Sequence, residues 1–446
     1  MQSRILGEAG AMGARNLQQH RTVTVALVLA LCLLMLLGTA GHAQGDSAGG
    51  DFVPGQVIVK LQPTGVTIED INVTYGSTTL ERFSTSSDVY LLMLPASSGV
   101  LETVSQMADD KRLLYSEPNF VTQSPEGASE GDARHRAWGV STVAPTSQEY
   151  AYKALNLSAA HRISLGKGTM VAVLDTGAQL DHPALLANFD GVKRYDFVDD
   201  DKNPSERKVG ADTDGDGITD ELLGHGTHVA GIVDIVAPKA KIMPLRVLDT
   251  EGYGNVFTIA QAVSYAERNG ANVINLSLGS GSRSKLLQQV IKSATAHGVL
   301  VAAAAGNSNS SLPHYPAAGN GVAASADGLV AVTSVGVTSL GVYSQKSDFA
   351  NYGSWVDVAA PGEGIRSAFP VDKYAYWSGT SMATPFVSGE AALVHAIYGS
   401  LDPAGVEKRI RCSARSLVVT DPIYGAVLGT GGADVGASLA PRGLCL

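Results

Sequence analysis

Three short segments of the chain carry the side chains that a serine needs to hydrolyse an amide bond. They are VAVLDTG, HGTHVAG and GTSMATP, and they supply a carboxylate at Asp175, an imidazole at His225 and a hydroxyl at Ser381. A serine hydroxyl is a weak nucleophile until a neighbouring base takes its proton, and a carboxylate fixes the tautomer of that base. If the fold brings these side chains together, they predict nucleophilic catalysis by Ser381.

The first two segments also have purely structural explanations. Asp175 ends a β-branched apolar run, which predicts a buried parallel strand, but the acid could simply cap the next turn. His225 begins an apolar helix, whose dipole favours a neutral imidazole that can act as a base. His225 and His228 could instead bind a metal, but the glutamate of a zinc-hydrolase helix is absent between them. Taken alone, His228 is best explained as a histidine that packs in the interior as part of the helix.

Ser381 lies at the start of another predicted helix, beside backbone N–H groups that have no partner within the helix. Those groups can stabilise an oxyanion, or Ser381 can be an ordinary helix cap. A fourth segment, VLVAAAAGNSN, predicts a strand that ends at Gly306 and Asn307. An asparagine amide placed there is an oxyanion donor, and loss of such a donor raises the barrier by about 2.7–4 kcal/mol. The coincidence of four such segments favours one catalytic site over four separate structural roles.

The motifs VAVLDTG, HGTHVAG, NLSLG, AAAAGN and GTSMATP stand in the order and approximate spacing of the subtilase family of serine proteases, which the chain resembles over about residues 150–439. The order Asp, His, Ser is that of subtilisin. The resemblance implies that Asp175 orients and charge-balances His225, the general base and acid. It also implies that Ser381 attacks the peptide carbonyl, and that the Asn307 side chain and the Ser381 backbone N–H hold the oxyanion.

The same resemblance implies two segments that contact the substrate. They are Ser277, Leu278 and Gly279 in one wall of the primary specificity pocket, and Gly252, Tyr253 and Gly254 in a strand that pairs with an extended substrate. The expected substrates are proteins or peptides.

Two other functional classes are compatible with parts of this pattern. Asp-Thr-Gly is also the catalytic turn of aspartic proteases, which need two carboxylates sharing a proton. The sequence holds a single Asp-Thr-Gly, so this alternative requires a dimer, whereas we expect a monomer. The other alternative is a non-enzymatic binding protein on a decayed protease fold, against which the intact Asp175, His225, Asn307 and Ser381 argue.

Strands and helices alternate from Thr169 onward, which predicts an α/β fold with a doubly wound parallel sheet of the subtilisin type, covered on both faces. We expect this catalytic domain to span residues 149–440. Two of the four site residues end strands and the other two begin helices. All four should therefore meet at the carboxyl edge of one sheet.

A smaller unit precedes this domain at residues 51–123. Its apolar patterns predict the order βαββαβ, a ferredoxin-like α+β arrangement, with helices expected at 68–73 and 99–109. The segments VYLLMLP and YSEPN resemble the inhibitory propeptide of subtilases, which implies an autoprocessed zymogen inhibited by its own propeptide. An unrelated α+β binding module is the alternative. Residues 124–148 are rich in Gly, Ser and charge, and we expect a linker with the maturation cleavage site there.

The N-terminus predicts export. The apolar run Val23–Leu37 follows Arg15 and Arg21 and precedes small residues, which is typical of a secretory signal peptide over residues 1–43. We expect a secreted protein, extracellular or periplasmic, with no stable membrane association once the signal is removed. An uncleaved anchor is the alternative. The net charge of −10 argues against nucleic acid as a partner.

Two features bear on stability in an exported protein. Cys412 and Cys445 remain after signal removal, which predicts one disulfide, with two free thiols as the alternative. The segment DTDGDGITD places four carboxylates with the spacing of a calcium loop: Asp212, Asp214, Asp216 and Asp220. Leu223 stands where the bidentate glutamate belongs, so a solvated acidic loop is equally compatible. The chemistry itself requires no cofactor, and calcium would be a structural ion.

Overall fold

The computed structural model describes residues 51–63, 65–86, 88–127, 136–146, 149–210, 212, 217–319 and 326–441. The expected signal peptide at 1–43 lies outside these residues. Within them, none of the helices combines the length and apolar character needed to cross a membrane.

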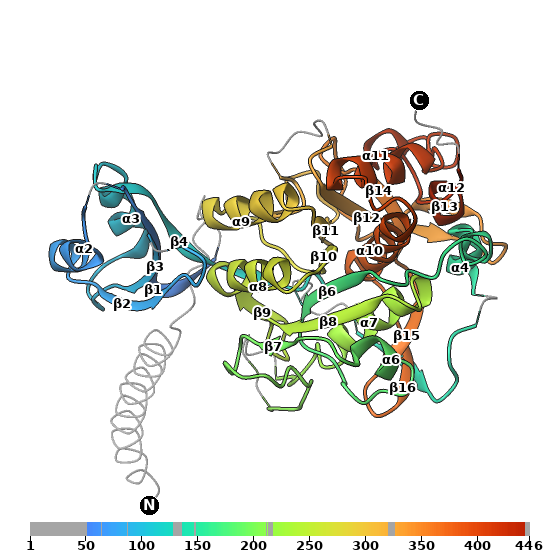
Figure 1. Ribbon diagram of the computed structural model, residues 1–446, viewed down its shortest axis with the longest axis horizontal. Helices are drawn as coiled ribbons and strands as arrows, with labels where there is room; N and C mark the ends of the chain where they lie inside the picture. The colour runs from blue at the N-terminus through green and yellow to red at the C-terminus, as the bar shows by residue number, and fades with distance from the viewer. Residues whose placement is uncertain are drawn as a thin grey trace, which may run out of the picture. The chain divides into compact units, whose positions relative to one another are not determined.

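A mixed, mostly parallel sheet forms the centre of the larger unit (Figure 1). Its strands run in the order β13-β12-β11-β10-β6-β8-β7, and β14 also pairs with β12. Their bounds are β6 Met170–Asp175, β7 Tyr195–Asp196, β8 Lys241–Arg246, β10 Val273–Leu276, β11 Leu300–Ala304, β12 Leu329–Val337, β13 Tyr343–Lys346 and β14 Val358–Pro361. All pairs are parallel except β12 with β13.

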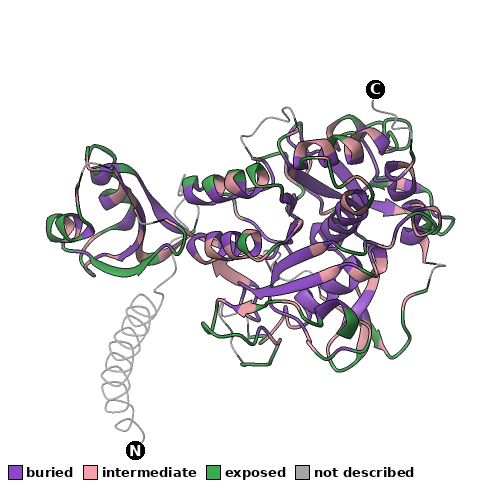
Figure 2. Cartoon of the chain, in the orientation of Figure 1, coloured by how far each residue is buried: buried purple, intermediate pink, exposed green. Residues whose placement is uncertain are grey.

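Helices cover both faces of this sheet. Successive side chains along each strand point to opposite faces, and both sets are apolar. Val171 and Val173 of β6 belong to the core beneath α7 and α10, whereas Ala172 and Leu174 belong to the core beneath α8 and α9. Figure 2 shows these strands as buried. The predicted doubly wound α/β fold is therefore confirmed.

The longer helices of this unit are α7 His225–Val236, α8 Val256–Arg268, α9 Lys285–Ala296, α10 Thr380–Ile397 and α11 Pro403–Ser413. Short helices are α4 Tyr150–Ala154, α5 Leu157–Ala160, α6 Leu186–Phe189, α12 Val435–Ser438 and a 3₁₀ turn at Gly425–Val427.

The smaller N-terminal unit has the predicted order βαββαβ. Its elements are β1 Phe52–Leu61, α2 Ile68–Tyr75, β2 Thr78–Arg82, β3 Val89–Met93, α3 Val100–Ala108 and β4 Leu113–Gln123. The strands form one sheet in the order β2-β3-β1-β4, and β9 (Tyr253–Asn255) of the larger unit adds to its free edge. The two units thus share a sheet.

The N-terminal unit also contacts the amino ends of α8 and α9. The Glu117 carboxylate accepts hydrogen bonds from the backbone N–H groups of Lys285 (2.7 Å) and Leu286 (3.0 Å), and Asn119 Oδ1 accepts one from Phe257 N (3.1 Å). First-turn N–H groups have no partner within their own helix, so this unit caps both helices.

Two described parts of the segment 124–148, where we expected a linker, pack on the larger unit. Ser124 and Glu126 are buried in the larger unit, and β5 (Trp138–Ser141) pairs with β16 (Lys373–Trp377). The same small sheet contains β15 (Ile365–Phe369). Stacking of Trp138 on Tyr376 helps to hold β5 in place, a tertiary contact that composition does not reveal.

Cys412 of α11 is disulfide-bonded, so it is not a free thiol. Its predicted partner, Cys445, lies outside the described residues.

Candidate active site

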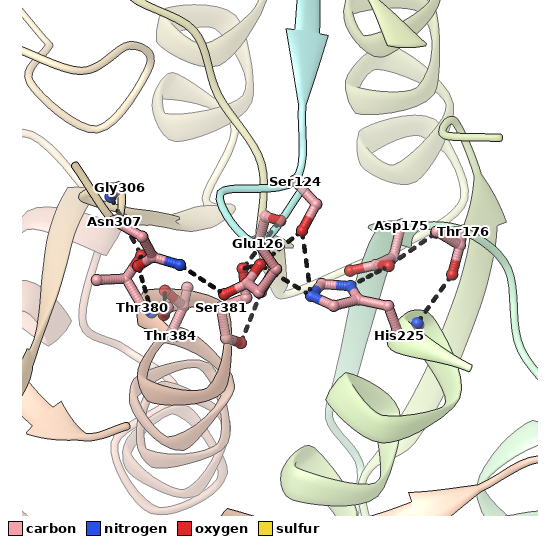
Figure 3. A network of polar contacts seen from close by, with 12 residues as sticks. Ser124, Glu126, Asp175, Thr176, His225, Gly306, Asn307, Thr380, Ser381 and Thr384 are labelled. Atoms are coloured by element: carbon pink, nitrogen blue, oxygen red, sulfur yellow. Dashed lines mark hydrogen bonds and ion pairs between the residues drawn. The ribbon is translucent and has the colours of Figure 1, made fainter. Parts of the chain in front are cut away.

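The fold brings Asp175 and His225 into direct contact (Figure 3). Asp175 is the last residue of β6 and His225 is the first residue of α7. Asp175 Oδ1 lies 2.7 Å from His225 Nδ1 and accepts a second hydrogen bond from Thr176 N at 2.8 Å. A carboxylate can only accept, so His225 Nδ1 carries a hydrogen and Nε2 faces the site.

A glycine allows the two elements to approach this closely. A Cβ on Gly226, the second residue of α7, would collide with the carbonyl oxygen of Gly177 and lie 3.1 Å from Asp175 Cβ. The N-terminus of α7 can therefore pack against the turn after β6 only because residue 226 has no side chain.

Ser381 lies in the first turn of α10, where a proline shapes the local hydrogen bonding. Pro385 has no N–H to donate to the carbonyl four residues earlier, which is that of Ser381. Instead, the Ser277 hydroxyl donates to this carbonyl at 3.0 Å. Ser277 thus supports the backbone of Ser381, and its own carbonyl oxygen lies 3.3 Å from Ser381 Oγ.

Asn307 follows β11 with its amide held in one orientation. Its Oδ1 accepts hydrogen bonds from both Thr380 N and Thr380 Oγ1, each at 2.9 Å. The amide nitrogen must therefore point the other way, toward Ser381. The Asn307 Nδ2 donor and the Ser381 hydroxyl thus border one small space.

Glu126, which sequence reasoning missed, occupies that space. Its Oε2 accepts a hydrogen bond from Ser381 Oγ at 2.6 Å and lies 3.2 Å from His225 Nε2. Its Oε1 accepts from Asn307 Nδ2 at 2.9 Å, and Ser124 Oγ donates to Oε2 at 2.5 Å. Ser381 and His225 thus meet on one carboxylate oxygen, rather than through a direct hydrogen bond.

The charges of Glu126 and His225 stabilise each other. Burial alone would raise the pKa of Glu126, but hydrogen bonding and attraction to His225 lower that pKa to about 2. Burial would lower the pKa of His225, but Asp175 and Glu126 raise it to about 10. Both shifts favour the charged forms of Glu126 and His225 while Glu126 occupies the site.

The expected substrate-binding segments flank the end of β4. Gln123 exchanges two backbone hydrogen bonds of 2.9 Å with Gly279. On its other edge, β4 pairs antiparallel with β9, where Thr122 lies opposite Gly254 and Gln123 opposite Tyr253. Ser124 N donates to the Gly252 carbonyl at 2.9 Å.

The chain then leaves this extended path at Pro125. Gly127 N donates to Ser124 O at 3.0 Å, which closes a turn. As a result the segment after β4 offers Ser381 Oγ the Glu126 side chain, and not one of its own backbone carbonyls. Leu278, the remaining residue of the expected pocket wall, is fully buried in the apolar core beneath α8 and α9.

The predicted calcium ligands are only partly described. Asp214 and Asp216 lie outside the described residues. The Asp220 carboxylate already accepts hydrogen bonds from Val209 N, Gly210 N and Thr250 Oγ1. Asp212 Oδ2 accepts one from Gly217 N. In the described part of the chain, no group of three His, Cys, Asp or Glu side chains has the arrangement of a metal site.

His228 fits the packed helix histidine that the sequence suggested. Its Nε2 lies 3.1 Å from Ile365 O and 3.2 Å from Ala375 O, so this nitrogen donates to carbonyls. Burial lowers its pKa to about 3.

Comparisons with known proteins identify the family of this chain. A model of the "Subtilase family" matches residues 166–431, and one of the "Fervidolysin N-terminal prodomain" matches residues 38–119. Thermitase of Thermoactinomyces vulgaris is 38% identical over 56% of this chain and 82% of its own length. Subtilisin BL of Lederbergia lenta is 37% identical over 65% of this chain and 95% of its own.

Among solved structures, fervidolysin from Fervidobacterium pennivorans, described as a keratinolytic enzyme related to subtilisin, aligns with a TM-score of 0.69 at 22% identity. The alignment covers 89% of this chain and 62% of fervidolysin, and it supports the fold alone. The family match and the curated relatives together place the chain in the subtilase family, as a serine-type endopeptidase that carries a fervidolysin-like N-terminal prodomain.

Proposed function

We propose that this chain is a secreted serine endopeptidase that hydrolyses proteins or peptides and is made as an autoprocessed zymogen. One observation carries the proposal: Ser381 Oγ, His225 Nε2 and Asn307 Nδ2 all contact the single carboxylate of Glu126. A nucleophile, a base and an oxyanion donor must converge in this way on a scissile peptide group.

Each residue has one role in the proposed reaction. Ser381 Oγ attacks the carbonyl carbon while His225 Nε2 takes its proton, and His225 later gives that proton to the leaving amine. Asp175 holds the imidazole through Nδ1 and stabilises the imidazolium. Asn307 Nδ2 and the Ser381 backbone N–H stabilise the tetrahedral oxyanion. Water then hydrolyses the acyl-enzyme by the same proton transfers.

Gly379 keeps the oxyanion position open. A Cβ on this residue would collide with Glu126 Oε1 and lie 3.1 Å from Asn307 Nδ2. Oε1 accepts the hydrogen bond that an oxyanion would accept, so it marks where the reacting oxygen would lie. A glycine next to Thr380 and Ser381 is therefore a steric requirement of the reaction.

An extended substrate would bind as β4 does. Residues 122–124 lie between β9 and Gly279 and bond to both edges through their backbones. Backbone pairing gives affinity for a substrate whatever its side chains are, as in other cases where a peptide adds a strand to a sheet edge. In this proposal Gly252, Tyr253 and Gly254 bind one edge of the substrate, and Ser277, Leu278 and Gly279 form the opposite wall.

The N-terminal unit would keep the new enzyme inactive, because the segment that follows it, residues 122–127 (the tail), fills the site. We propose a signal peptide at 1–43, an inhibitory propeptide at 51–123, a maturation cleavage within 124–148 and a catalytic domain at 149–440. Since Glu126 offers a side chain to Ser381, cleavage requires the tail to shift or to be cut by a second molecule. The mature enzyme would act as a monomer, without stable membrane association.

Replacing Ser381 by Ala tests the function. The S381A chain should accumulate unprocessed and should not hydrolyse casein or react with a fluorophosphonate. A matched control is S388A on the same helix, where the lost hydroxyl donates to Asn275 Oδ1 at 2.8 Å. This control should process and cleave normally. Activity retained by S381A, or inhibition by pepstatin at acid pH, would contradict the serine mechanism.

Calcium remains a separate proposal for a structural ion at Asp212, Asp214, Asp216 and Asp220. It predicts that a chelator lowers the melting temperature of the mature enzyme and that added calcium restores it. An unchanged melting curve would favour the solvated acidic loop.

A further inference from the structure

Glu206 joins the segment that carries Asp175 to the helix that carries His225. It lies in the loop between β7 and α7, far along the chain from β6. Its Oε1 accepts hydrogen bonds from Gly224 N and Gly226 N, each at 3.1 Å, and from the Thr176 hydroxyl. Its Oε2 accepts from the Thr227 hydroxyl.

These donors are the chain neighbours of the acid and the base. Thr176 directly follows Asp175, and residues 224 and 226 lie on either side of His225. The residue before α7 is a glycine, so this position has no side chain to cap the helix. The N–H groups of the first turn need an acceptor, and Glu206 supplies it from another loop.

Both threonine hydroxyls are bound on two sides. The Thr176 hydroxyl accepts from Gly226 N at 2.9 Å and donates to Glu206. The Thr227 hydroxyl accepts from Gln179 N at 2.7 Å and donates to Glu206. Because a hydroxyl has one hydrogen, the carboxylate decides where that hydrogen points. The loop after β6 and the first turn of α7 are thereby fixed to each other.

We propose that Glu206 is a positioning residue that holds Asp175 and His225 in proton-transfer geometry without touching either side chain. This inference rests on the proposed roles of Asp175 and His225. It predicts that loss of the carboxylate lowers kcat far more than it alters KM, because the substrate edges at β9 and Gly279 do not depend on it.

The charge of Glu206 adds a second, separable effect. The titratable groups that face His225 are Asp175, Glu126, Glu206 and His228. Burial, the largest cause, and repulsion by Asp175 raise the pKa of Glu206 above its ordinary value, and the hydrogen bonds from Thr176 and Thr227 and the attraction to His225 only partly oppose this rise. An ionised Glu206 stabilises the imidazolium. Removing this charge should lower the pKa of His225, so that the acid limb of kcat/KM moves to lower pH.

Three variants of the full chain separate position from charge. E206A removes the acceptor, E206Q keeps one oxygen acceptor without the charge, and E206D keeps the charge on a shorter side chain. E407Q and E407A are matched controls, because Glu407 is a buried carboxylate that accepts from Asp327 N (3.0 Å) and Gly328 N (2.9 Å) away from the site. A variant that does not process itself is matured with bead-bound wild-type enzyme, which is then removed.

For E206A we expect kcat to fall by about 10–100-fold with KM within about twofold, since small misplacements of reacting groups cost rates of this size. E206D should recover part of kcat, and E206Q should shift the acid limb. The Glu407 variants should lose stability while their kcat and pH profile stay unchanged. A folded E206A enzyme with wild-type kcat and an unshifted acid limb would show that Glu206 is only a helix cap. That result would leave the Ser381 test untouched, whereas an active S381A would overturn the proposed function itself.

Discussion

The Oε2 atom of Glu126 lies 2.6 Å from the Oγ atom of Ser381, within hydrogen-bonding distance, although the two residues are 255 positions apart in the sequence. The same oxygen lies 3.2 Å from His225 Nε2. A side-chain carboxylate contains no amide bond. It can therefore contact the nucleophile, the base and the oxyanion donor at the same time without being cleaved. In the proposed zymogen, this contact would block the active site for as long as the N-terminal unit stays in place.

Removing the Glu126 carboxylate should weaken this block. A hydrogen bond to a charged group contributes about 1.5–3 kcal/mol, and a factor of ten corresponds to about 1.4 kcal/mol. In E126A, fluorophosphonate labelling of Ser381 should therefore accelerate by about tenfold or more while residues 51–127 are still present, as verified by mass spectrometry. E102A, which removes an exposed glutamate from α3 of the same unit, should label at the wild-type rate. Equal rates for E126A and wild type would mean that β4 pairing alone blocks the site.

The meeting of the four candidate site residues was predictable, because parallel strands of one sheet end at a common edge. Asp175 ends a strand of that sheet and Asn307 follows another, while His225 and Ser381 lie in the first turns of helices that pack on it, so their convergence followed from alternation and motif order. The βαββαβ order of the N-terminal unit was predictable from period-2 and period-3.6 patterns in the same way. These are local signals whose three-dimensional consequence is fixed by a common fold.

Glu126 and Glu206 could not be predicted in this way. Glu126 lies in SPEG, whose composition is typical of a linker, and its importance comes from partners far along the chain. Glu206 lies in the charged loop segment NPSERK, whose composition does not indicate contacts with the core. The position of Thr380 in the site was easier to predict, because it directly precedes Ser381. Its hydrogen bonds to Asn307 were not predictable, because they depend on the packing of α10 against β11. Burial of polar groups by tertiary contacts leaves little trace in composition.

Inhibition by the tail should weaken as the pH rises above neutrality. The Glu126 pKa is lowered to about 2, so its contribution is complete above the ordinary value of 4.5 and is lost as the pH falls toward 2. The His225 pKa is raised to about 10, so its contribution is complete below the ordinary value of 6.5 and is lost as the pH rises toward 10. The block should be strongest between about pH 4.5 and 6.5.

Labelling rates across this range measure the effect. At each pH, the labelling rate of the tail-bound enzyme is divided by that of the mature enzyme. This ratio cancels the effect on the rate of the ionisation of His225 and of its remaining neighbours, which are Asp175, Glu206 and His228. This ratio should rise by up to tenfold per pH unit between the His225 pKa of the tail-free enzyme, which Asp175 also raises, and about 10, because one proton is linked to docking. In E126Q the rise should be much smaller. A flat ratio in the wild type would contradict the ion pair.

Loss of the Asn307 amide should slow the chemical step. N307A removes the side-chain oxyanion donor and should lower kcat by about 10²–10³ with little change in KM. N309A is a matched control in the same loop, because Asn309 Oδ1 only accepts from Lys346 Nζ at 2.8 Å. Steady-state kinetics on a peptide substrate distinguish the two. Near-normal kcat in a folded N307A enzyme would remove Asn307 from the oxyanion site.

A methyl group at Gly379 should block the reaction and the inhibitory contact together. The added Cβ would collide with Glu126 Oε1, at the position assigned to the oxyanion. G379A should therefore fold but lose at least about 100-fold in kcat, a loss comparable to that of an oxyanion donor. The same variant should hold its N-terminal tail less tightly, so that added protease cuts residues 124–127 more readily than in the S381A chain. G399A, where a Cβ meets only a carbonyl at 3.4 Å, should match the wild type in both assays. If G379A kept full activity, the reacting oxygen would have to lie elsewhere, and the assignment of the Glu126 Oε1 position to the oxyanion would be wrong.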